Sequence, residues 1–554
     1  MQTTIQRCFA IIILLKLCTA YRSTDNIVVS NNGYCTYIGE TLTRQGGNAR
    51  EVFIGVSLCE GLVHPMDSGL GGGFQGVYYD QGQQATSALF IDAREKSPNN
   101  PNFINYPIRN GNSIGIPSVL AGYELLYNIE PHKNRLQWSQ IIQPVLNLCK
   151  TGFYITWKTK EMFMILLQNY AYRTNLRTNI EFKNNVMRNP QLCETLAQIS
   201  KDGPSSSMYK PNGILHQGLL NDLRASNSFI TSNDIVNYRA RAELPATIRF
   251  DKYTVFASKV PGSGQAILFA LKIMERMRVI IRRQATEAEK IVYLLKILKY
   301  AYALQSNLRE LPEKTINKII QSGSSIADGI IKNGIKCRST IPTKFGNVTL
   351  ARIEAPRDQG TTNIIIKVGN SAVTGSSSIN SLFGSGIHSE NLGIFYNNHL
   401  RDFSKSTWRR KGKPLQNVIG PNKTPSSSIA PIIMVNSNGE PVFQIGSAGG
   451  AKILSAIINT LYNYFVLGKT LQDSIHACRI LPKFSYARNN VKFQYECGNE
   501  VVANYLRQNG IDYKQNEIAG HSAVTAMSKM GRVPEAVFDY RRGGAYYISP
   551  PTYY

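Results

Sequence analysis

The sequence predicts a mixed α/β protein in which strands are sandwiched between helices. A capping box formed by Thr286 and Glu289 opens the strongest predicted helix, in which apolar residues recur at helical spacing. Residues 363–374 show strand patterns on both sides of a two-residue turn and therefore predict a hairpin. Because both kinds of element are strongly indicated, we exclude a purely helical and a purely β architecture.

The other predicted elements follow this mixture along the chain. A turn at 115–118 opens a run of helical character at 119–126. In the second half, an apolar run at 429–435 precedes a further helix at 453–465. No internal repeat of about 20–50 residues is visible, so the sequence does not predict a solenoid or a propeller.

Length and composition exclude several classes of protein. The chain has 554 residues, of which 43% are hydrophobic and 18% charged, enough apolar side chains for a large core. Disorder, collagen and a small disulfide-stapled scaffold are excluded, and no uninterrupted apolar run is long enough for a membrane-embedded bundle. The net charge of +26 is typical of a protein that meets polyanions or has a surface adapted to them.

The first twenty residues have the pattern of a cleavable secretory signal. Arg7 precedes the apolar run 8–15, and small residues lie near Ala20. The alternative is a signal anchor, but Lys16 leaves the apolar run too short to span a bilayer. We therefore expect residues 1–20 to direct secretion and to be removed.

Secretion would allow the cysteines to form disulfides and the asparagines of sequons to be glycosylated. Removal of Cys8 and Cys18 would leave seven of the nine cysteines, an odd number, so at least one thiol would stay free or pair between chains. Asn347 and Asn422 each begin an Asn-x-Thr sequon that could be glycosylated in the secretory pathway.

Familiar cofactor and metal motifs are missing or out of context. The sequence has no His-Glu-x-x-His helix and no Cys-x-x-Cys pair, and its seven histidines lack ligand spacing, so we expect neither a metal nor a cofactor. Residues 111–115 match a nucleophile elbow in letters only, because a loop precedes them. Residues 69–73 lack the lysine of a P-loop and are interpreted as a turn where backbones pack closely.

Two sets of small residues carry more specific chemistry. Gly360-Thr361-Thr362 stands directly before a predicted strand, and residues 424–428 are followed by the glycine-rich segment 446–450. A threonine that begins a chain can use its own α-amine as the base that activates its hydroxyl. Glycine pairs offer unhindered N–H groups to an oxyanion. Taken alone, either set is also compatible with an ordinary loop.

In this order, the two sets resemble those of the γ-glutamyltransferases (glutathione hydrolases), which are N-terminal-nucleophile hydrolases. The resemblance covers nearly the whole mature chain and implies a four-layer αββα sandwich. The matching motifs lie at 35–40, 45–48, 59, 68–73, 92–95, 115–117, 261–265, 299–303, 360–362, 378–380, 383–385, 393–394, 397–398, 402–404, 425–428 and 449–450.

The resemblance implies that the precursor cuts itself between Gly360 and Thr361. The large subunit would then be residues 21–360 and the small subunit residues 361–554, held together as a heterodimer. Thr361 matches the nucleophile, Ser378 a threonine that hydrogen-bonds near it, and Gly449 and Gly450 the pair that stabilises the oxyanion.

The resemblance also assigns the residues that hold a γ-glutamyl group. Arg94, Ser427 and Ser428 match the ligands of its α-carboxylate, and Asn380 and Asp402 match ligands of its α-ammonium group. Without the resemblance, Arg94 would be interpreted as a salt bridge to Glu95 or Asp92. Cys35 and Cys59 match a family disulfide.

The sequence departs from the family pattern at three positions. A third ammonium ligand, normally Glu or Gln, is replaced by His399, Arg401 stands beside Asp402 where a second acid is common, and Asn363 replaces a frequent histidine. A neutral imidazole offers the ammonium only a lone pair and a protonated one repels it, so we expect weak turnover that falls below about pH 6.5.

Two functions follow from the resemblance. The first is a secreted enzyme that passes the glutamyl group of glutathione or another γ-glutamyl compound to water, an amino acid or a peptide. The alternative is a venom-type pseudoenzyme that acts by binding. The basic segment 407–413 is interpreted as a solvated loop or as a docking site for a polyanion or cell surface, and no nucleic-acid partner is expected.

Overall fold

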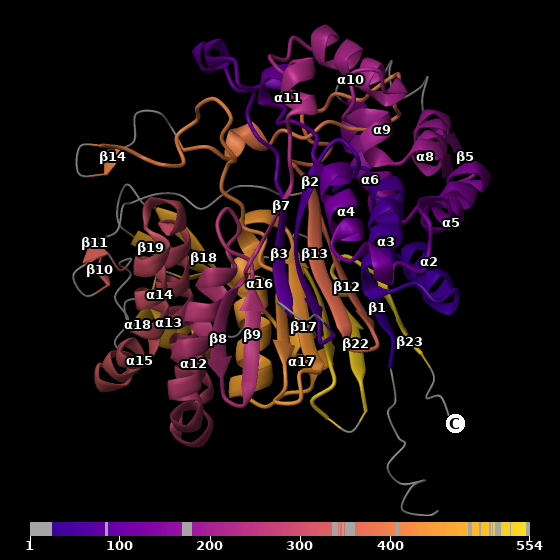
Figure 1. The fold of residues 1–554 in the computed structure, drawn as a ribbon. Helices are drawn as coiled ribbons and strands as arrows, with labels where there is room; N and C mark the ends of the chain where they lie inside the picture. Colours follow the sequence, from indigo (N-terminus) through magenta and orange to yellow (C-terminus); the bar gives the residue numbers. More distant parts are fainter. Residues whose placement is uncertain are drawn as a thin grey trace, which may run out of the picture.

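The structure is a computed structural model of the chain (Figure 1). It describes residues 25–549 except for 83–86, 169–179, 335–341, 343, 346–347, 350–359, 405–408, 411–412, 486–489, 498–499, 509–510, 512, 516–521 and 532. The predicted signal segment 1–20, Asn347 and Cys337 therefore lie outside the described residues.

Two β-sheets form the middle of the molecule. The seven-stranded sheet has the order β23 (Ala545–Ile548), β1 (Ile27–Ser30), β12 (Gly360–Val368), β13 (Ser371–Asn380), β2 (Gly73–Asp80), β3 (Ala88–Ala93) and β7 (Arg241–Glu243). The six-stranded sheet has the order β22 (Glu535–Phe538), β21 (Ala523–Ser528), β17 (Pro441–Ala448), β16 (Ile432–Val435), β9 (Tyr253–Ala257) and β8 (Ala246–Phe250).

The two sheets pack face to face, and strand periodicity explains how. On β12, Ile365 is buried in a cluster with Met527 of the other sheet, whereas Ile364 and Ile366 are buried on the opposite side. Successive side chains of a strand point to opposite faces, so this strand contributes to both an inter-sheet core and a helix–sheet core. The run Ile364–Ile366 of β12 is accordingly apolar on both faces.

Helices cover the outer face of each sheet (Figure 1). The seven-stranded sheet is covered by α2 (Gly33–Arg44), α3 (Ala49–Val63), α4 (Val119–Asn128), α5 (Trp138–Thr151) and α8 (Pro190–Asp202). The six-stranded sheet is covered by α12 (Gly264–Gln284), α13 (Glu287–Gln305) and α16 (Ile453–Leu461). The layers are therefore α, β, β and α, which confirms the predicted fold class.

The remaining elements lie around these layers. They are η1 (Pro101–Asn105), η2 (Asn110–Ser113), η3 (Pro131–Lys133), β4 (Phe153–Tyr154), α6 (Trp157–Gln168), β5 (Glu181–Lys183), β6 (Val186–Arg188), α9 (Pro204–Met208), α10 (Ile214–Ala225), α11 (Ser232–Val236), η5 (Leu308–Glu310), α14 (Glu313–Gln321), α15 (Gly323–Lys332), β10 (Lys344–Phe345), β11 (Val348–Thr349), η6 (His399–Asp402), β14 (Arg409–Arg410), β15 (Lys413–Pro414), η7 (Gly450–Lys452), η8 (Tyr462–Val466), α17 (Leu471–His476), β18 (Ile480–Ser485), β19 (Asn490–Tyr495), α18 (Glu500–Gln508) and β20 (Tyr513–Gln515).

The strongest predictions from local sequence are confirmed. Thr286 caps α13, with both hydrogen bonds of its capping box to Glu289 in place. The hairpin β12–β13 turns at Gly369, whose φ of +58° favours glycine. The predicted helix at 453–465 ends earlier as an α-helix, at Leu461, and continues as the π-helical turn η8.

Three disulfides connect described residues. Cys35–Cys59 joins α2 to α3, which is the pairing that the resemblance implied. Cys149–Cys193 joins α5 to α8, and Cys478–Cys497 flanks the β18–β19 hairpin. These pairs include six of the seven cysteines after residue 20, and the seventh, Cys337, lies outside the described residues.

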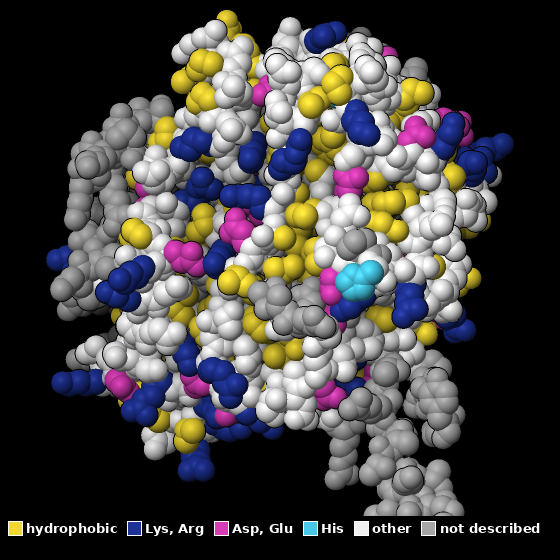
Figure 2. Space-filling view, in the orientation of Figure 1, with side chains coloured by type: hydrophobic (Ala, Val, Ile, Leu, Met, Phe, Trp, Pro, Cys, Tyr) yellow, Lys and Arg dark blue, Asp and Glu magenta, His cyan; other side chains and the backbone are white. Residues whose placement is uncertain are grey.

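The surface includes the predicted glycosylation site Asn422 and part of the basic segment 407–413. Asn422 is exposed, and its backbone N–H donates to the Pro98 carbonyl. Arg409–Arg410 and Lys413–Pro414 pair as the short ladder β14–β15, and the rest of the basic segment lies outside the described residues. Lys and Arg side chains are spread over the face seen in Figure 2. Within the described part of the chain, no helix is long and apolar enough to cross a bilayer.

Candidate active site

The candidate nucleophile lies at the start of β12, in the middle of the seven-stranded sheet. Gly360 pairs with Asn380 and Thr361 with Ser378, and the register shifts between Gly360 and Thr361. The Thr361 side chain is fully buried. The bulge therefore separates the two residues of the predicted scissile bond.

Ser378 connects the two sides of that bond. Its Oγ donates to the Gly360 carbonyl oxygen at 2.5 Å and accepts from the Thr361 hydroxyl at 3.3 Å. It also accepts from the backbone N–H of Asn380 at 3.0 Å. These bonds use the one donor and both lone pairs of the serine hydroxyl. Ser378 is thus positioned to polarise the Gly360 carbonyl, and the same hydroxyl contacts the Thr361 hydroxyl.

The glycine-rich turn at 69–73 packs directly against the backbone of Ser378 and Phe395. A Cβ on Gly72 would lie 2.1 Å from the Ser378 carbonyl oxygen, and one on Gly71 would lie 2.1 Å from the Phe395 carbonyl oxygen. Both distances are impossible for a side chain, which confirms the interpretation of this segment as a turn where backbones pack closely.

Arg94 and Asp402 form a buried ion pair beside Asn380. Arg94 follows β3 directly and is 2% exposed. Its Nη2 donates to Asp402 Oδ2 at 2.7 Å and to the Ser426 carbonyl oxygen at 3.3 Å. Asn380 Nδ2 donates to Asp402 Oδ1 at 3.0 Å. Since Asn380 also contacts Ser378, the predicted carboxylate and ammonium ligands are linked to the nucleophile through hydrogen bonds.

The two serines after Ser426 are buried, and the Ser427 Oγ accepts from the backbone N–H of Ile429 at 3.1 Å. The Ser427 carbonyl accepts from Ser263 Oγ at 2.7 Å, and Ser428 Oγ accepts from Gln305 Nε2 at 3.5 Å. The structure therefore joins these serines to α12 and α13, and it brings the Ser426 carbonyl rather than a serine hydroxyl to Arg94.

His399 is fully buried and lies against Glu95. The two atoms His399 Nδ1 and Glu95 Oε1 are 2.8 Å apart, although the contact lacks hydrogen-bond alignment. Burial, followed by the nearby Arg94 cation, lowers the pKa of His399 to about 4, and Glu95 only partly opposes this. The loss of activity that protonation of His399 would cause is therefore expected at a pH well below 6.5.

The other two departures have different surroundings. Arg401 is exposed. Asn363 is fully buried between the sheets, where its side chain accepts from Ser376 Oγ at 2.7 Å and donates to Thr525 Oγ1. Asn363 is therefore a structural cross-link between the two sheets.

Gly449 and Gly450 follow β17 and have left-handed backbones, with φ of +117° and +63°. On the same strand, Gly446 packs against the Asn363 amide, where a Cβ would lie 2.1 Å away. The end of β17 thus lies against the first part of β12, two residues after Thr361.

Arg542 is a site residue that the sequence did not reveal. Its Nη1 donates to the Thr361 carbonyl oxygen and its Nη2 to Asp67 Oδ1 at 2.8 Å. Arg542 lies between β22 and β23, 181 residues from Thr361 in sequence. A lone arginine near the C-terminus carries no signal for such a contact, so only the fold reveals it.

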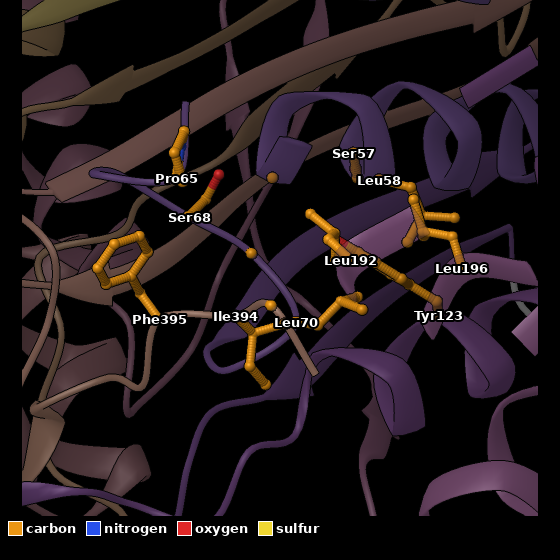
Figure 3. A pocket seen from close by; sticks show the side chains of 13 residues that line it. Ser57, Leu58, Pro65, Ser68, Leu70, Tyr123, Leu192, Leu196, Ile394 and Phe395 are labelled. Carbon is orange, nitrogen blue, oxygen red and sulfur yellow. The ribbon is translucent and has the colours of Figure 1, made fainter. Parts of the chain in front are cut away.

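A small cavity lies between α3, α4, α8 and the segments 65–70 and 393–395 (Figure 3). Its lining includes Ser57, Tyr123 and Ser68, and Ser68 Oγ accepts from the Thr362 hydroxyl at 3.2 Å. Thr361, Arg94 and Ser427 do not line it. Among the described residues, no group of three or more His, Cys, Asp and Glu side chains could hold a metal ion.

Comparison with known proteins identifies the family of this chain. The sequence model of Gamma-glutamyltranspeptidase matches residues 35–549. Scoloptoxin SSD14 of Scolopendra dehaani is 28% identical over 94% of this chain and 92% of its own, and glutathione hydrolase 5 proenzyme of Mus musculus is 26% identical over the same shares. Glutathione hydrolase 3 of Arabidopsis thaliana is 27% identical over 83% of this chain and 73% of its own.

A solved structure supports the fold independently. Cephalosporin acylase from Bacillus halodurans superimposes with a TM-score of 0.80 at 15% identity, over 95% of this chain and 96% of its own. At that identity the likeness concerns the fold alone. The family match, which spans nearly all of the sequence, decides the assignment: the chain belongs to the γ-glutamyltranspeptidase family.

Proposed function

We propose that this protein is a secreted γ-glutamyltransferase and glutathione hydrolase that activates itself by cutting between Gly360 and Thr361. The observation that carries the proposal is the Ser378 hydroxyl, which donates to the Gly360 carbonyl and accepts from the Thr361 hydroxyl. The Arg94–Asp402 pair lies one hydrogen-bonded residue away. Secretion rests on the signal pattern at 1–20.

Self-cleavage is an N-to-O acyl shift followed by hydrolysis. The Thr361 hydroxyl oxygen attacks the Gly360 carbonyl carbon, and Ser378 stabilises the oxyanion that develops on the carbonyl oxygen. The C–N bond then breaks as the nitrogen takes up the proton that the Thr361 hydroxyl gave up, which leaves Gly360 as an ester on Thr361 and frees the α-amine of Thr361. Water hydrolyses the ester, so the products are a large subunit ending in a Gly360 carboxylate and a small subunit beginning with Thr361.

Turnover uses the amine that cleavage creates. The α-amine takes the hydroxyl proton as Thr361 attacks the γ-carbonyl of a γ-glutamyl compound, and it returns the proton to the departing amine. N–H groups of Gly449 and Gly450 would stabilise the oxyanion. Water or the amine of an amino acid or peptide then takes the glutamyl group from the Thr361 ester, which regenerates the hydroxyl.

The charges of the site suit an α-amino acid. Arg94 and Asp402 neutralise each other in the uncut chain, since they are 2.7 Å apart and both nearly fully buried. A zwitterion can enter between them with its carboxylate on Arg94 and its ammonium on Asp402 and Asn380, without changing the net charge of the site. Ser427 and Ser428 would add hydroxyl donors to the carboxylate after a local rearrangement.

The proposal is tested by incubating the purified protein with glutathione and measuring free glutamate. Wild type is expected to run as two fragments and to release glutamate, whereas Thr361→Ala is expected to stay uncut and inactive. Thr362→Ala is the matched control, because the neighbouring hydroxyl contacts Ser68 instead of Ser378. Glutamate release by the Thr361→Ala protein at the wild-type rate would overturn the proposal.

A binding function is the second candidate, and His399 is the observation that favours it. A neutral, buried imidazole stands where the resemblance implies a Glu or Gln ligand of the substrate ammonium. A protein named as a toxin, Scoloptoxin SSD14, is among its relatives. If the purified protein is cut at Gly360–Thr361 but releases no glutamate from any γ-glutamyl compound, this second function replaces the first.

A further inference from the structure

Glu95, His399 and Arg94 form a buried cluster whose polar atoms are only partly satisfied. Glu95 and His399 are fully buried and Arg94 is 2% exposed. Among the described residues, neither Glu95 oxygen, neither His399 ring nitrogen and not Arg94 Nε has an aligned hydrogen-bond partner. Buried polar groups without partners are costly, so a cluster of five such atoms indicates a place that a ligand completes.

The Glu95 carboxylate is held in place by glycines. A Cβ on Gly115 would lie 2.7 Å from Glu95 Cβ, and a Cβ on Gly73 would lie 2.9 Å from Glu95 Cδ. The backbone at both positions therefore packs directly against the side chain and restricts its movement. His399 is fixed at its own backbone, where its N–H donates to Asn397 Oδ1 at 3.1 Å.

Within the cluster, the shortest contact joins Glu95 to His399. His399 Nδ1 is 2.8 Å from Glu95 Oε1, whereas Arg94 Nε is 3.9 Å from Glu95 Oε2. Arg94 already has a carboxylate partner in Asp402 at 2.7 Å. His399 is therefore the nearest partner of the Glu95 carboxylate, through a contact that is short but lacks hydrogen-bond alignment.

We infer that Glu95 is a positioning residue that fixes the tautomer of His399, so that His399 Nε2 presents a lone pair to the α-ammonium of the γ-glutamyl group. This inference rests on the proposed function for the identity of the ligand. An ionised carboxylate only accepts hydrogen bonds, so the nitrogen that faces it must carry the proton. In a neutral imidazole the other nitrogen is then an acceptor, and an ammonium group only donates.

The protonation state of the ring agrees with this assignment. Burial keeps the pKa of His399 at about 4, so the ring is neutral at physiological pH and keeps one acceptor. Glu95 and His399 together then supply what a carboxylate on the ammonium would supply: an oriented acceptor next to a negative charge. The altered site would therefore still select compounds with a free α-amine.

The test compares two ligands that differ only in that amine. Binding of L-glutamate and of glutarate, which lacks the α-amine, is measured by titration calorimetry on the cut protein. Wild type is expected to prefer L-glutamate, and Glu95→Gln is expected to weaken L-glutamate binding about tenfold while changing glutarate binding little. His399→Asn is expected to give the same amine-specific loss. Self-cleavage on a gel verifies that each variant folds.

The double variant separates action through His399 from action on Arg94. If Glu95 works through the imidazole, Glu95→Gln has no further effect in the His399→Asn background. The inference is overturned if the effect persists there, if both ligands are weakened equally, or if wild type does not distinguish them. Glu95→Asp, which keeps the charge but shortens the reach, gives a second route should Glu95→Gln fail to fold, and it is expected to show the same selective loss.

Calorimetry and the glutathione assay together distinguish a failure of the role of Glu95 from a failure of the proposed enzymatic function. Amine-dependent binding without glutathione hydrolysis would support the role of Glu95 and contradict the proposed enzymatic function. Glutathione hydrolysis without an amine-specific effect of Glu95→Gln would leave the enzymatic function in place and overturn the role of Glu95.

Discussion

Replacing Ser378 with alanine tests the chemistry of self-cleavage most directly. The change removes the hydroxyl that donates to the Gly360 carbonyl oxygen at 2.5 Å, and with it the acceptor of the Thr361 hydroxyl. Removing one such oxyanion donor costs about 2.7–4 kcal/mol in known enzymes, which corresponds to a rate loss of about two to three orders of magnitude. We therefore expect Ser378→Ala to accumulate as an uncut chain.

The assay is a time course of the purified precursor on a denaturing gel. The small product comprises residues 361–554 and is expected at about 22 kDa, its 194/554 share of the 61.7 kDa chain before any glycan. Ser377→Ala is the matched control, because that neighbouring hydroxyl contacts the Gly73 carbonyl at 3.3 Å instead of the scissile bond. Ser378→Thr, which keeps the hydroxyl, is expected to restore cutting.

The outcome that would refute this reasoning is equal cutting rates for Ser378→Ala and wild type. Ser378 would then not stabilise the developing oxyanion, and another donor would have to be sought. Slow cutting in both Ser377→Ala and Ser378→Ala would instead indicate a general disturbance of β13, and the specific role of Ser378 would likewise fail.

Three further variants test separate parts of the site. Asp402→Asn removes the carboxylate from a buried pair, a change that costs about 3–5 kcal/mol, so kcat/KM for γ-glutamyl donors should fall by a hundredfold or more; an unchanged value would contradict the pairing role. Arg542→Gln loses a charged hydrogen bond to the Thr361 carbonyl and should slow self-cleavage about tenfold on gels while leaving L-glutamate affinity nearly unchanged. Burial lowers the pKa of His388 from 6.5 to about 4, so native-state stability should be lost as pH falls from 6.5 towards 4, and His388→Phe should flatten that loss in urea midpoints measured across this range; equal slopes would argue against it.

Local sequence patterns predicted the regular elements well and their ends less well. The capping box at Thr286 marks the start of α13 because both of its hydrogen bonds are local. The β12 strand was expected from Asn363 but begins at Gly360. Thr361 and Thr362 lack the apolar alternation of a buried strand, yet they pair with Ser378 and Ser377 of β13 and are buried inside the fold. That burial is a property of the sheet, which periodicity in one segment does not encode.

The candidate site could be proposed only through the family resemblance, and the contacts among its residues could not be predicted from the sequence. Without the resemblance, Arg94 was expected to pair with Glu95 or Asp92. In the structure its closest partner is Asp402, 308 residues away, and Asp92 instead contacts Arg241 at 2.6 Å. Such pairs form where strand ends and loops converge in the fold, so neighbours in sequence are poor guides to them.

In the proposed mechanism, self-cleavage and turnover depend on different contacts. The groups next to the scissile bond are Ser378 and the Arg542 that binds the Thr361 carbonyl, and neither touches His399 in a described hydrogen bond. In the proposed mechanism, recognition of a substrate ammonium depends instead on Asp402, Asn380 and the Glu95–His399 contact. A chain can therefore keep its self-cleavage while its affinity for γ-glutamyl compounds drifts. For that reason, a cut protein is not by itself evidence of an active enzyme, and ligand binding has to be measured separately from processing.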